Sequence, residues 1–132
     1  MHGATFIEAA TQRGAVAVLT DVAGFAHCKD LPALVVSDVR AAGALVASSL
    51  YKYPTRDLSS IGITGTNGKT TVSTLLYQIF EAVGRDTGLI GTVETRIGSE
   101  VIKSSRTTPE APELQSLAAV MRERHMLSLI HI

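Results

Sequence analysis

Apolar residues in this chain gather in short continuous runs that are separated by helical stripes. The runs at residues 15–20 and 33–38 are rich in alanine, valine and leucine, which is typical of buried strands. A helical pattern over residues 4–13 stops at Gly14, and a second helical pattern covers residues 40–51. The segment between the two strands reads as a loop. This order predicts a small unit of alternating helices and strands.

The alternation resumes after a polar linker that contains a proline. Strands are expected at residues 59–64 and 87–92, with a helix over residues 70–83 between them. The inward positions of that helix are expected to be Val72, Leu75, Leu76, Ile79 and Phe80. We place a domain boundary in the linker, so that the first part covers residues 1–57 and the second begins at residue 58.

A hairpin and a last helix complete the pattern. Gly98 and Ser99 form a Gly-X pair that suits a type II′ turn. Thr108 is expected to cap the last helix and Pro109 to take its first position, since acidic residues follow in the first turn. Because helices and strands alternate throughout, the predicted fold class is α/β with mainly parallel strands.

The last six residues, "LSLIHI" at 127–132, differ in character from the charged segment before them. They read like the in-frame translation of a common sequencing-transposon end. We interpret them as a non-native scar and leave them out of the fold prediction, which then ends at residue 126. The alternative is an apolar strand that continues the alternation. On the scar interpretation, the chain is a fragment of a longer protein.

Composition narrows the class of protein. The 132 residues include 12 basic and 12 acidic side chains, so no basic excess is available to neutralise nucleic-acid phosphates. The single cysteine, Cys28, excludes an internal disulfide framework and fits a reducing compartment. No apolar run approaches the roughly 20 residues that span a bilayer, and the first residues do not resemble a signal peptide. We expect a cytoplasmic protein without membrane insertion or nucleic-acid partner.

The segment "GITGTNGKTT", residues 62–71, carries the clearest chemistry. A strand that turns through glycines into a helix directs free backbone N–H groups at one point, where the helix dipole also favours an anion. Lys69 would place an ammonium on the β- and γ-phosphates of ATP, and Thr70 would offer a hydroxyl to Mg²⁺. The predicted nucleotide-binding residues are Gly65, Thr66, Asn67, Gly68, Lys69, Thr70 and Thr71.

The spacing of this loop departs from the standard Walker pattern, which would need a glycine where Ile63 stands. The alternative is an ordinary strand-to-helix turn in which Lys69 is solvated. A shorter loop can still bind phosphate, provided that its N–H groups converge. The strand before it, the amphipathic helix after it and the hydroxyls on both sides of Gly68 and Lys69 favour the phosphate interpretation.

The form T-G-T-N-G-K-T resembles the ATP loop of the Mur ligase family. "HGATFIEAATQRGAVAVLTD", "GRDTGLIGTVETRIG" and "TTPEAPELQ" extend the resemblance over residues 2–126 and point to the MurE type, which acts on UDP-N-acetylmuramoyl-L-alanyl-D-glutamate. The resemblance implies that residues 1–57 end a UDP-substrate-binding domain and that residues 58–126 begin a P-loop-type central ATP-binding domain. It also implies a monomeric parent enzyme.

Enzymes of this family are similar in mechanism. ATP phosphorylates a substrate carboxylate, and an amine attacks the acyl phosphate to form an amide. In the MurE type, the resemblance implies addition of a diamino acid to the UDP-muramoyl dipeptide in peptidoglycan synthesis, with Lys69 as the catalytic residue. Thr107 and Thr108 match the family's substrate-contacting pair, and Arg106 is a weaker candidate. Later segments of the family are expected after residue 126, so we expect this chain alone to be inactive.

Two alternatives remain open from the sequence. Folylpolyglutamate synthases have related chemistry and a similar loop, but glycine and serine usually follow their lysine, where Thr70 and Thr71 stand here. A nucleotide-binding module without ligase activity is the alternative from another class. His27 and Cys28 have no second metal ligand at suitable spacing, so they do not predict a metal site.

Overall fold

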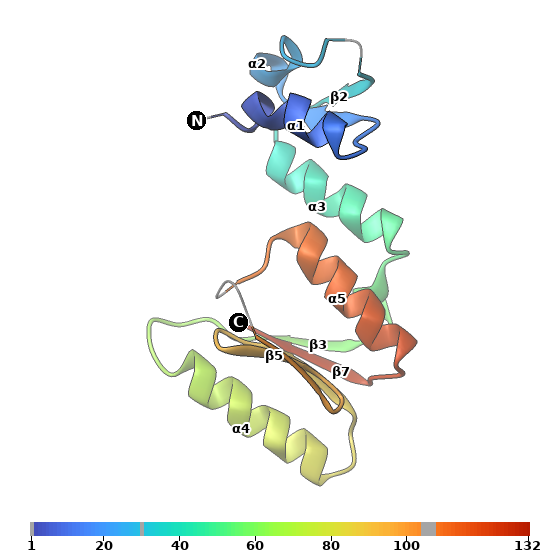
Figure 1. The fold of residues 1–132 in the computed structure, drawn as a ribbon. Helices are drawn as coiled ribbons and strands as arrows, with labels where there is room; N and C mark the ends of the chain where they lie inside the picture. The colour runs from blue at the N-terminus through green and yellow to red at the C-terminus, as the bar shows by residue number, and fades with distance from the viewer. Residues whose placement is uncertain (1, 30, 104–107) are drawn as a thin grey trace. The chain divides into compact units, whose positions relative to one another are not determined.

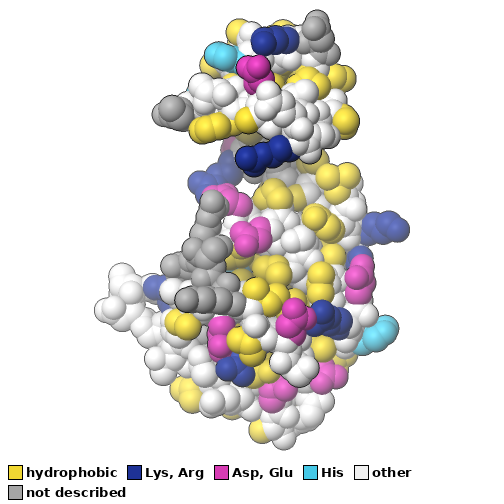
Figure 2. Space-filling model, in the orientation of Figure 1, with side chains coloured by type: hydrophobic (Ala, Val, Ile, Leu, Met, Phe, Trp, Pro, Cys, Tyr) yellow, Lys and Arg dark blue, Asp and Glu magenta, His cyan; other side chains and the backbone are white. Residues whose placement is uncertain are grey.

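The computed structural model describes residues 2–29, 31–103 and 108–132, and it confirms the α/β class. The chain forms two compact units, residues 1–46 and residues 47–132 (Figure 1). No helix in the described part of the chain is both long enough and apolar enough to cross a membrane. On the face shown in Figure 2, acidic and basic side chains are interspersed.

The first unit is built from short elements, and the helix that leaves it continues into the second unit. Its two strands are parallel, with Val18 opposite Ala33 and Thr20 opposite Val35. The elements are η1 (Gly3–Phe6), α1 (Ile7–Gln12), β1 (Val18–Thr20), α2 (Val22–Phe25), β2 (Ala33–Val35) and α3 (Val39–Leu50). Helix α2 replaces part of the predicted loop, because the Asp21 side chain accepts a hydrogen bond from the Gly24 N–H and caps it.

The strands of the first unit are less buried than their composition suggests. Leu34 and Val35 of β2 are 57% and 40% exposed, so the prediction of a fully buried second strand is wrong for the described structure. The buried positions are instead small side chains, among them Ala4, Thr20 and Cys28. The apolar run of alanine, leucine and valine therefore predicted the position of β2 correctly, but it did not predict how exposed the strand is.

The second unit is a five-stranded sheet in the order β3-β7-β4-β5-β6. Its elements are η2 (Pro54–Arg56), β3 (Ser59–Gly62), α4 (Lys69–Ala82), β4 (Thr87–Ile90), β5 (Glu94–Ile97), β6 (Glu100–Lys103), α5 (Ala111–Glu123) and β7 (Ser128–His131). Strands β3, β7 and β4 are parallel, and the hairpin β5–β6 adds two antiparallel strands. In Figure 1, α4 and α5 lie on opposite faces of this sheet.

The core of the second unit lies between α5 and the sheet. Ala118 and Met121 of α5 are fully buried and belong to one cluster with Ile90, Ile97 and Leu129. Helix α5 approaches β4 closely at Gly88, where an added Cβ would lie 2.3 Å from the Met121 sulfur and would force that side chain to move. Parallel strands that are packed on both faces have continuous apolar sequences, which explains why β4 could be predicted from the sequence.

Strand β7 corrects the fold prediction that ended at residue 126. Ser128–His131 pair in parallel with β3 on one side and with β4 on the other, and Ser128 and Ile130 are fully buried. The alternative of an apolar strand is therefore what the structure shows. A sheet predicted without these residues lacks the strand that joins β3 to β4. The non-native origin of residues 127–132 stays a prediction.

Helix α4 ends as predicted, but its buried stripe overlaps the predicted one only in part, through the half-buried Leu76 and Phe80. The N–H of Gly84, at φ 73°, donates to the Glu81 carbonyl, and the N–H of Arg85 donates to the Phe80 carbonyl, which together form a Schellman end. Three of the predicted inward residues, Val72, Leu75 and Ile79, are 46–56% exposed. The buried residue is Ser73, because the helix contacts β4 and β7 through the neighbouring stripe.

The hairpin is confirmed, whereas the start of the last helix lies later than predicted. Gly98 has a φ of 60° and Ile97 pairs with Glu100, as a two-residue turn requires. Helix α5 begins at Ala111 with Glu110 as its N-cap residue, and proline occupies its first turn at position 112. Thr108 is therefore not the cap, and Pro109 lies before the helix.

The division into compact units lies before the predicted boundary at residues 57 and 58. The end of α3 and the turn η2 belong to the second unit. Arg122 of α5 holds them there, since its guanidinium donates to the carbonyls of Lys52 at 3.0 Å and Tyr51 at 3.3 Å. The assignment of residues 1–57 and 58–126 to two functional domains remains a prediction.

Candidate functional site

The loop between β3 and α4 adopts a conformation that needs glycine at two positions. Strand β3 ends at Gly62 and helix α4 begins at Lys69. Gly65 has a φ of 152° and Gly68 a φ of 79°, both in the region that L side chains avoid. No atom lies within 4 Å of the place that a Cβ at Gly68 would take, so the backbone there is open to an approaching ligand.

The start of helix α4 presents N–H groups that have no partner within the helix. Gly68 is the N-cap residue, and no side chain caps the helix. The first hydrogen bond of the helix is donated by the Val72 N–H to the Gly68 carbonyl at 2.9 Å. The preceding N–H groups, from Gly68 to Thr71, have no partner within the helix, and the helix dipole adds positive potential at the same point. This is an anion-binding arrangement.

Lys69 adds a full positive charge to the loop. Its Nζ donates to the Gly65 carbonyl at 2.6 Å and reaches the Thr66 carbonyl at 3.5 Å. The side chain therefore bends back over its own loop, and the choice between a phosphate site and an ordinary turn stays a prediction. The loop carbonyls hold the ammonium close to the unpaired N–H groups of the helix start.

The remaining loop side chains are polar and exposed. Thr66, Asn67, Thr70 and Thr71 all face solvent around the helix start. Within the described ranges, no group of three or more histidine, cysteine, aspartate or glutamate side chains could hold a metal ion. A cation at this loop would therefore need oxygen ligands from a phosphate chain and water in addition to the Thr70 hydroxyl.

The loop lies at the edge of the sheet where the parallel strands end. The Ile63 N–H donates to the His131 carbonyl at 2.8 Å, which joins the start of the loop to the end of β7. The Thr108 hydroxyl donates to the carbonyl of Ile132, just after β7, at 3.3 Å. Ligands of open α/β sheets bind at this edge. The structure thus brings Thr108 to the edge that carries the loop, while Thr107 and Arg106 lie outside the described residues.

His131 also occupies this edge and was missed by the sequence analysis. Its Nδ1 is buried without a hydrogen-bond partner among the described residues, and burial lowers the pKa of the imidazole. The alternation of apolar residues in "LSLIHI" was the available signal, but the interpretation of these residues as a scar set it aside. Because that interpretation stays open, we assign His131 no function.

Comparison with known proteins identifies the family. Residues 63–130, just over half of the chain, match the family model of the Mur ligase middle domain. The chain belongs to the Mur ligase family. The matched segment contains the loop after Ile63, helix α4, strands β4, β5 and β6, helix α5 and β7 as far as Ile130.

Two similar curated proteins both carry the name UDP-N-acetylmuramoyl-L-alanyl-D-glutamate--2,6-diaminopimelate ligase. The protein from Streptomyces avermitilis is 56% identical over 126 residues, which is 94% of this chain and 25% of that protein. The protein from Corynebacterium glutamicum is 44% identical over 133 residues, covering 98% of this chain and 26% of that protein. The chain therefore spans about a quarter of the length of these relatives.

A solved structure under the same name shares the fold of this Mur ligase chain. It superimposes with a TM-score of 0.73 at 24% identity, and the match covers 96% of this chain and 25% of that one. At this level of identity the likeness supports the arrangement of elements alone. Mur ligases as a family are ATP-dependent enzymes, and the phosphates of ATP are anions of the kind that a helix start such as that of α4 can bind.

Proposed function

We propose that this chain contains the ATP-phosphate-binding loop of a MurE-type ligase. The parent enzyme would add a diamino acid to UDP-N-acetylmuramoyl-L-alanyl-D-glutamate, with an acyl phosphate formed on the substrate carboxylate before the amine attacks. The observation that carries the proposal is the uncapped start of α4, over which Lys69 is held by the Gly65 carbonyl. The names of the curated relatives support the substrates.

The loop suits a triphosphate in both charge and shape. The N–H groups of residues 68–71 can each donate to a phosphate oxygen, and donation to an anion is stronger than donation to a neutral acceptor. The Lys69 ammonium can exchange its bond to Gly65 for one to the β- and γ-phosphates. Thr66, Asn67 and Thr71 add polar groups around the chain of phosphates. Catalysis of this kind rests on positioning and charge neutralisation.

Mg²⁺ fits the same loop through Thr70. The Thr70 hydroxyl lies in the first turn of α4 and is exposed. Mg²⁺ is commonly bound by one or two protein oxygens together with phosphates and water, so a single hydroxyl is an adequate protein contribution. When bound, the ion supplies neutralisation of the phosphate charge.

Thr107 and Thr108 are proposed to contact the UDP-muramoyl dipeptide. Support comes from the position of Thr108, whose hydroxyl reaches the end of β7 at the edge that also carries the loop. Cytoplasmic localisation, a monomeric parent and the absence of nucleic-acid and membrane partners belong to the same proposal. We expect the chain by itself to form no amide bond, because it spans only a quarter of its relatives.

Nucleotide titration of the chain tests the proposal. We expect ATP with Mg²⁺ to shift the amide NMR signals of residues 65–71 in a saturable way. Lys69→Ala should weaken this binding about tenfold or more, as loss of a charged hydrogen bond to phosphate implies. Lys52→Ala is the matched control, since Lys52 is exposed and lies outside the loop. Unchanged binding in Lys69→Ala would contradict the proposal.

A second variant tests the cation. Thr70→Val keeps the shape of the side chain but removes its hydroxyl. We expect ATP to bind this variant equally well with Mg²⁺ and with a chelator, whereas the unchanged chain should bind more tightly with Mg²⁺. A full Mg²⁺ effect in Thr70→Val would show that the hydroxyl is not a ligand.

A further inference from the structure

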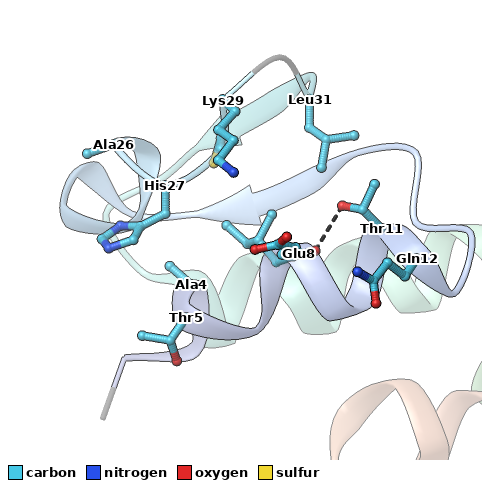
Figure 3. A pocket seen from close by; sticks show the side chains of 11 residues that line it. Ala4, Thr5, Glu8, Thr11, Gln12, Ala26, His27, Lys29 and Leu31 are labelled. Carbon is cyan, nitrogen blue, oxygen red and sulfur yellow. Dashed lines mark hydrogen bonds between the residues drawn. The ribbon is translucent and has the colours of Figure 1, made fainter.

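A pocket of about 640 Å³ lies in the first unit, apart from the chemistry of the loop (Figure 3). Helix α1 forms one wall, and the other is formed by Ala26, His27, Cys28, Lys29 and Leu31, which follow α2. Its volume falls within the range of small-molecule sites in proteins. The proposed function leaves this pocket without a role.

The walls of the pocket carry opposite charges. Glu8 projects from α1 and Lys29 from the facing segment, and Figure 3 shows Lys29 and Leu31 extending toward Glu8 and Thr11. Neither the Glu8 carboxylate nor the Lys29 ammonium forms an ion pair or hydrogen bond with another described residue. The two groups therefore face the pocket as an available anion and an available cation.

Two other polar groups of the walls, on Thr11 and Cys28, are already engaged, while Gln12 and His27 also line the pocket. The Thr11 hydroxyl donates to the Ile7 carbonyl at 2.8 Å, as the dashed line in Figure 3 shows. The Cys28 thiol is 1% exposed and donates to the Gly24 carbonyl at 3.6 Å. Most of the remaining contact surface is aliphatic, from Ala4, Ile7, Ala26 and Leu31.

We propose that this pocket binds a small aliphatic zwitterion of the amino-acid class. The ligand ammonium would pair with the Glu8 carboxylate, the ligand carboxylate with the Lys29 ammonium, and the aliphatic body would lie against Ile7 and Leu31. A phosphate ester fits less well, because it would meet the Glu8 carboxylate. A purely apolar ligand would leave both charges desolvated and unpaired. The proposal does not depend on the nucleotide loop.

L-Leucine and two analogues provide a direct test. Leucine amide lacks the carboxylate, and 4-methylpentanoate lacks the ammonium. We expect L-leucine to shift the amide signals around Glu8 and Lys29 saturably, with a dissociation constant on the order of 1 mM because both charges are exposed. Each analogue should bind roughly tenfold more weakly, since each loses one charged contact. The absence of a saturable response to L-leucine would overturn the proposal.

Matched variants separate this site from unspecific effects. Glu8→Gln and Lys29→Met should each weaken L-leucine binding about tenfold. Lys29→Met should bind L-leucine no better than leucine amide, because the partner of the ligand carboxylate is gone. Glu8→Gln should bind L-leucine no better than 4-methylpentanoate, because the partner of the ligand ammonium is gone. Lys52→Met and Glu123→Gln are the controls; Lys52, like Lys29, has a positive φ, and Glu123 is exposed outside the pocket. Amide spectra of the free variants verify that each remains folded. Equal effects in variants and controls would refute the assignment.

Discussion

The Nζ of Lys69 lies 2.6 Å from the carbonyl oxygen of Gly65, four residues earlier in the chain. This contact ties the first residue of α4 to the loop that precedes it. The positive charge is thus held beside the helix start without any charged side chain near it in the loop. A bound phosphate would not need to order a flexible lysine, which reduces the entropy lost on binding.

Gly68→Ala should damage both the loop and nucleotide binding. Gly68 has a φ of 79°, and a left-handed conformation costs an L residue about 1–2 kcal/mol. We expect a loss of that size in the free energy of unfolding of the second unit, measured by urea denaturation, together with weaker ATP binding. Gly62→Ala is the control, because Gly62 also has open space around it but no positive φ. Equal stability of the two variants would contradict this explanation.

Gly24→Ala should destabilise the first unit for a steric reason. A Cβ at Gly24 would lie 2.0 Å from the Thr20 hydroxyl oxygen and 2.8 Å from a ring carbon of His2. Overpacking of this kind typically costs about 1–3 kcal/mol. Gly43→Ala in α3 meets only ordinary contact at 3.8 Å and should stabilise its helix by up to about 1 kcal/mol. Thermal unfolding of both variants tests the contrast, and a stable Gly24→Ala chain would show that the backbone relaxes around the clash.

Asp21 should make the first unit sensitive to acid. Its carboxylate accepts the Gly24 N–H at 2.8 Å and lies 3.1 Å from the His2 Nε2. The Gly24 hydrogen bond, and next the His2 hydrogen bond, hold the pKa of Asp21 below its ordinary value of 3.8. Because the folded pKa is depressed, the stabilisation is complete above the unfolded pKa and is lost as the pH falls through the folded pKa.

The Gly24 amide signal reports this titration directly. Between about pH 5 and pH 2, its chemical shift should follow a single transition with a midpoint below 3.8. Asp21→Asn keeps a capping side chain but removes the charge, so the transition should vanish in that variant. A midpoint at or above 3.8 would mean that the Gly24 hydrogen bond does not favour the charged form.

Arg122→Ala should loosen the turn before β3. The guanidinium donates to two backbone carbonyls, those of Lys52 and Tyr51, and lies 3.6 Å from the Asp57 carboxylate. Loss of these bonds is expected to lower the free energy of unfolding by about 1–2 kcal/mol and to speed amide hydrogen exchange in residues 51–57. Arg124→Ala serves as the control, because Arg124 pairs with Glu100 and donates to the Ile97 carbonyl, both outside residues 51–57. Similar exchange in both variants would argue against the role of Arg122.

Much of the fold was available from the sequence because its signals are local. Gly84 ends helix α4 and Gly98 forms the hairpin turn, and both have positive φ values. The helix end and the hairpin predicted at these glycines are confirmed. The loop at Gly65 and Gly68 was recognisable for the same reason. Thr108 was misplaced as a helix cap because two threonines and a proline before acidic residues resemble a helix start, whereas the structure begins α5 at Ala111.

Features that depend on contacts between residues far apart in the chain could not be predicted from local sequence signals. The buried face of α4 was assigned to the most apolar stripe, yet the structure buries Ser73 and leaves Leu75 exposed. The pairing of Arg122 with the turn at Lys52 joins residues 70 positions apart, which no local pattern encodes. Among the candidate site residues, those of the loop were contiguous in sequence, whereas the approach of Thr108 to the strand ends depends on β7.

Removal of residues 127–132 should unfold the second unit. Strand β7 is hydrogen-bonded on both sides, so its loss would leave β3 and β4 with unpaired backbone groups and would expose the apolar face that packs on α5. We expect the chain ending at residue 126 to lose the cooperative thermal transition of the second unit and to aggregate.

A full-length variant shows which property of β7 matters. The Leu129→Val and Ile130→Val double variant retains the strand and most of its buried apolar surface. We expect this variant to keep a cooperative transition, because backbone pairing and burial, and not this particular sequence, hold the sheet together. Its free energy of unfolding should fall by about 1–3 kcal/mol. If the shortened chain unfolds with the same transition as the full-length chain, β7 is dispensable and the sheet must close without it.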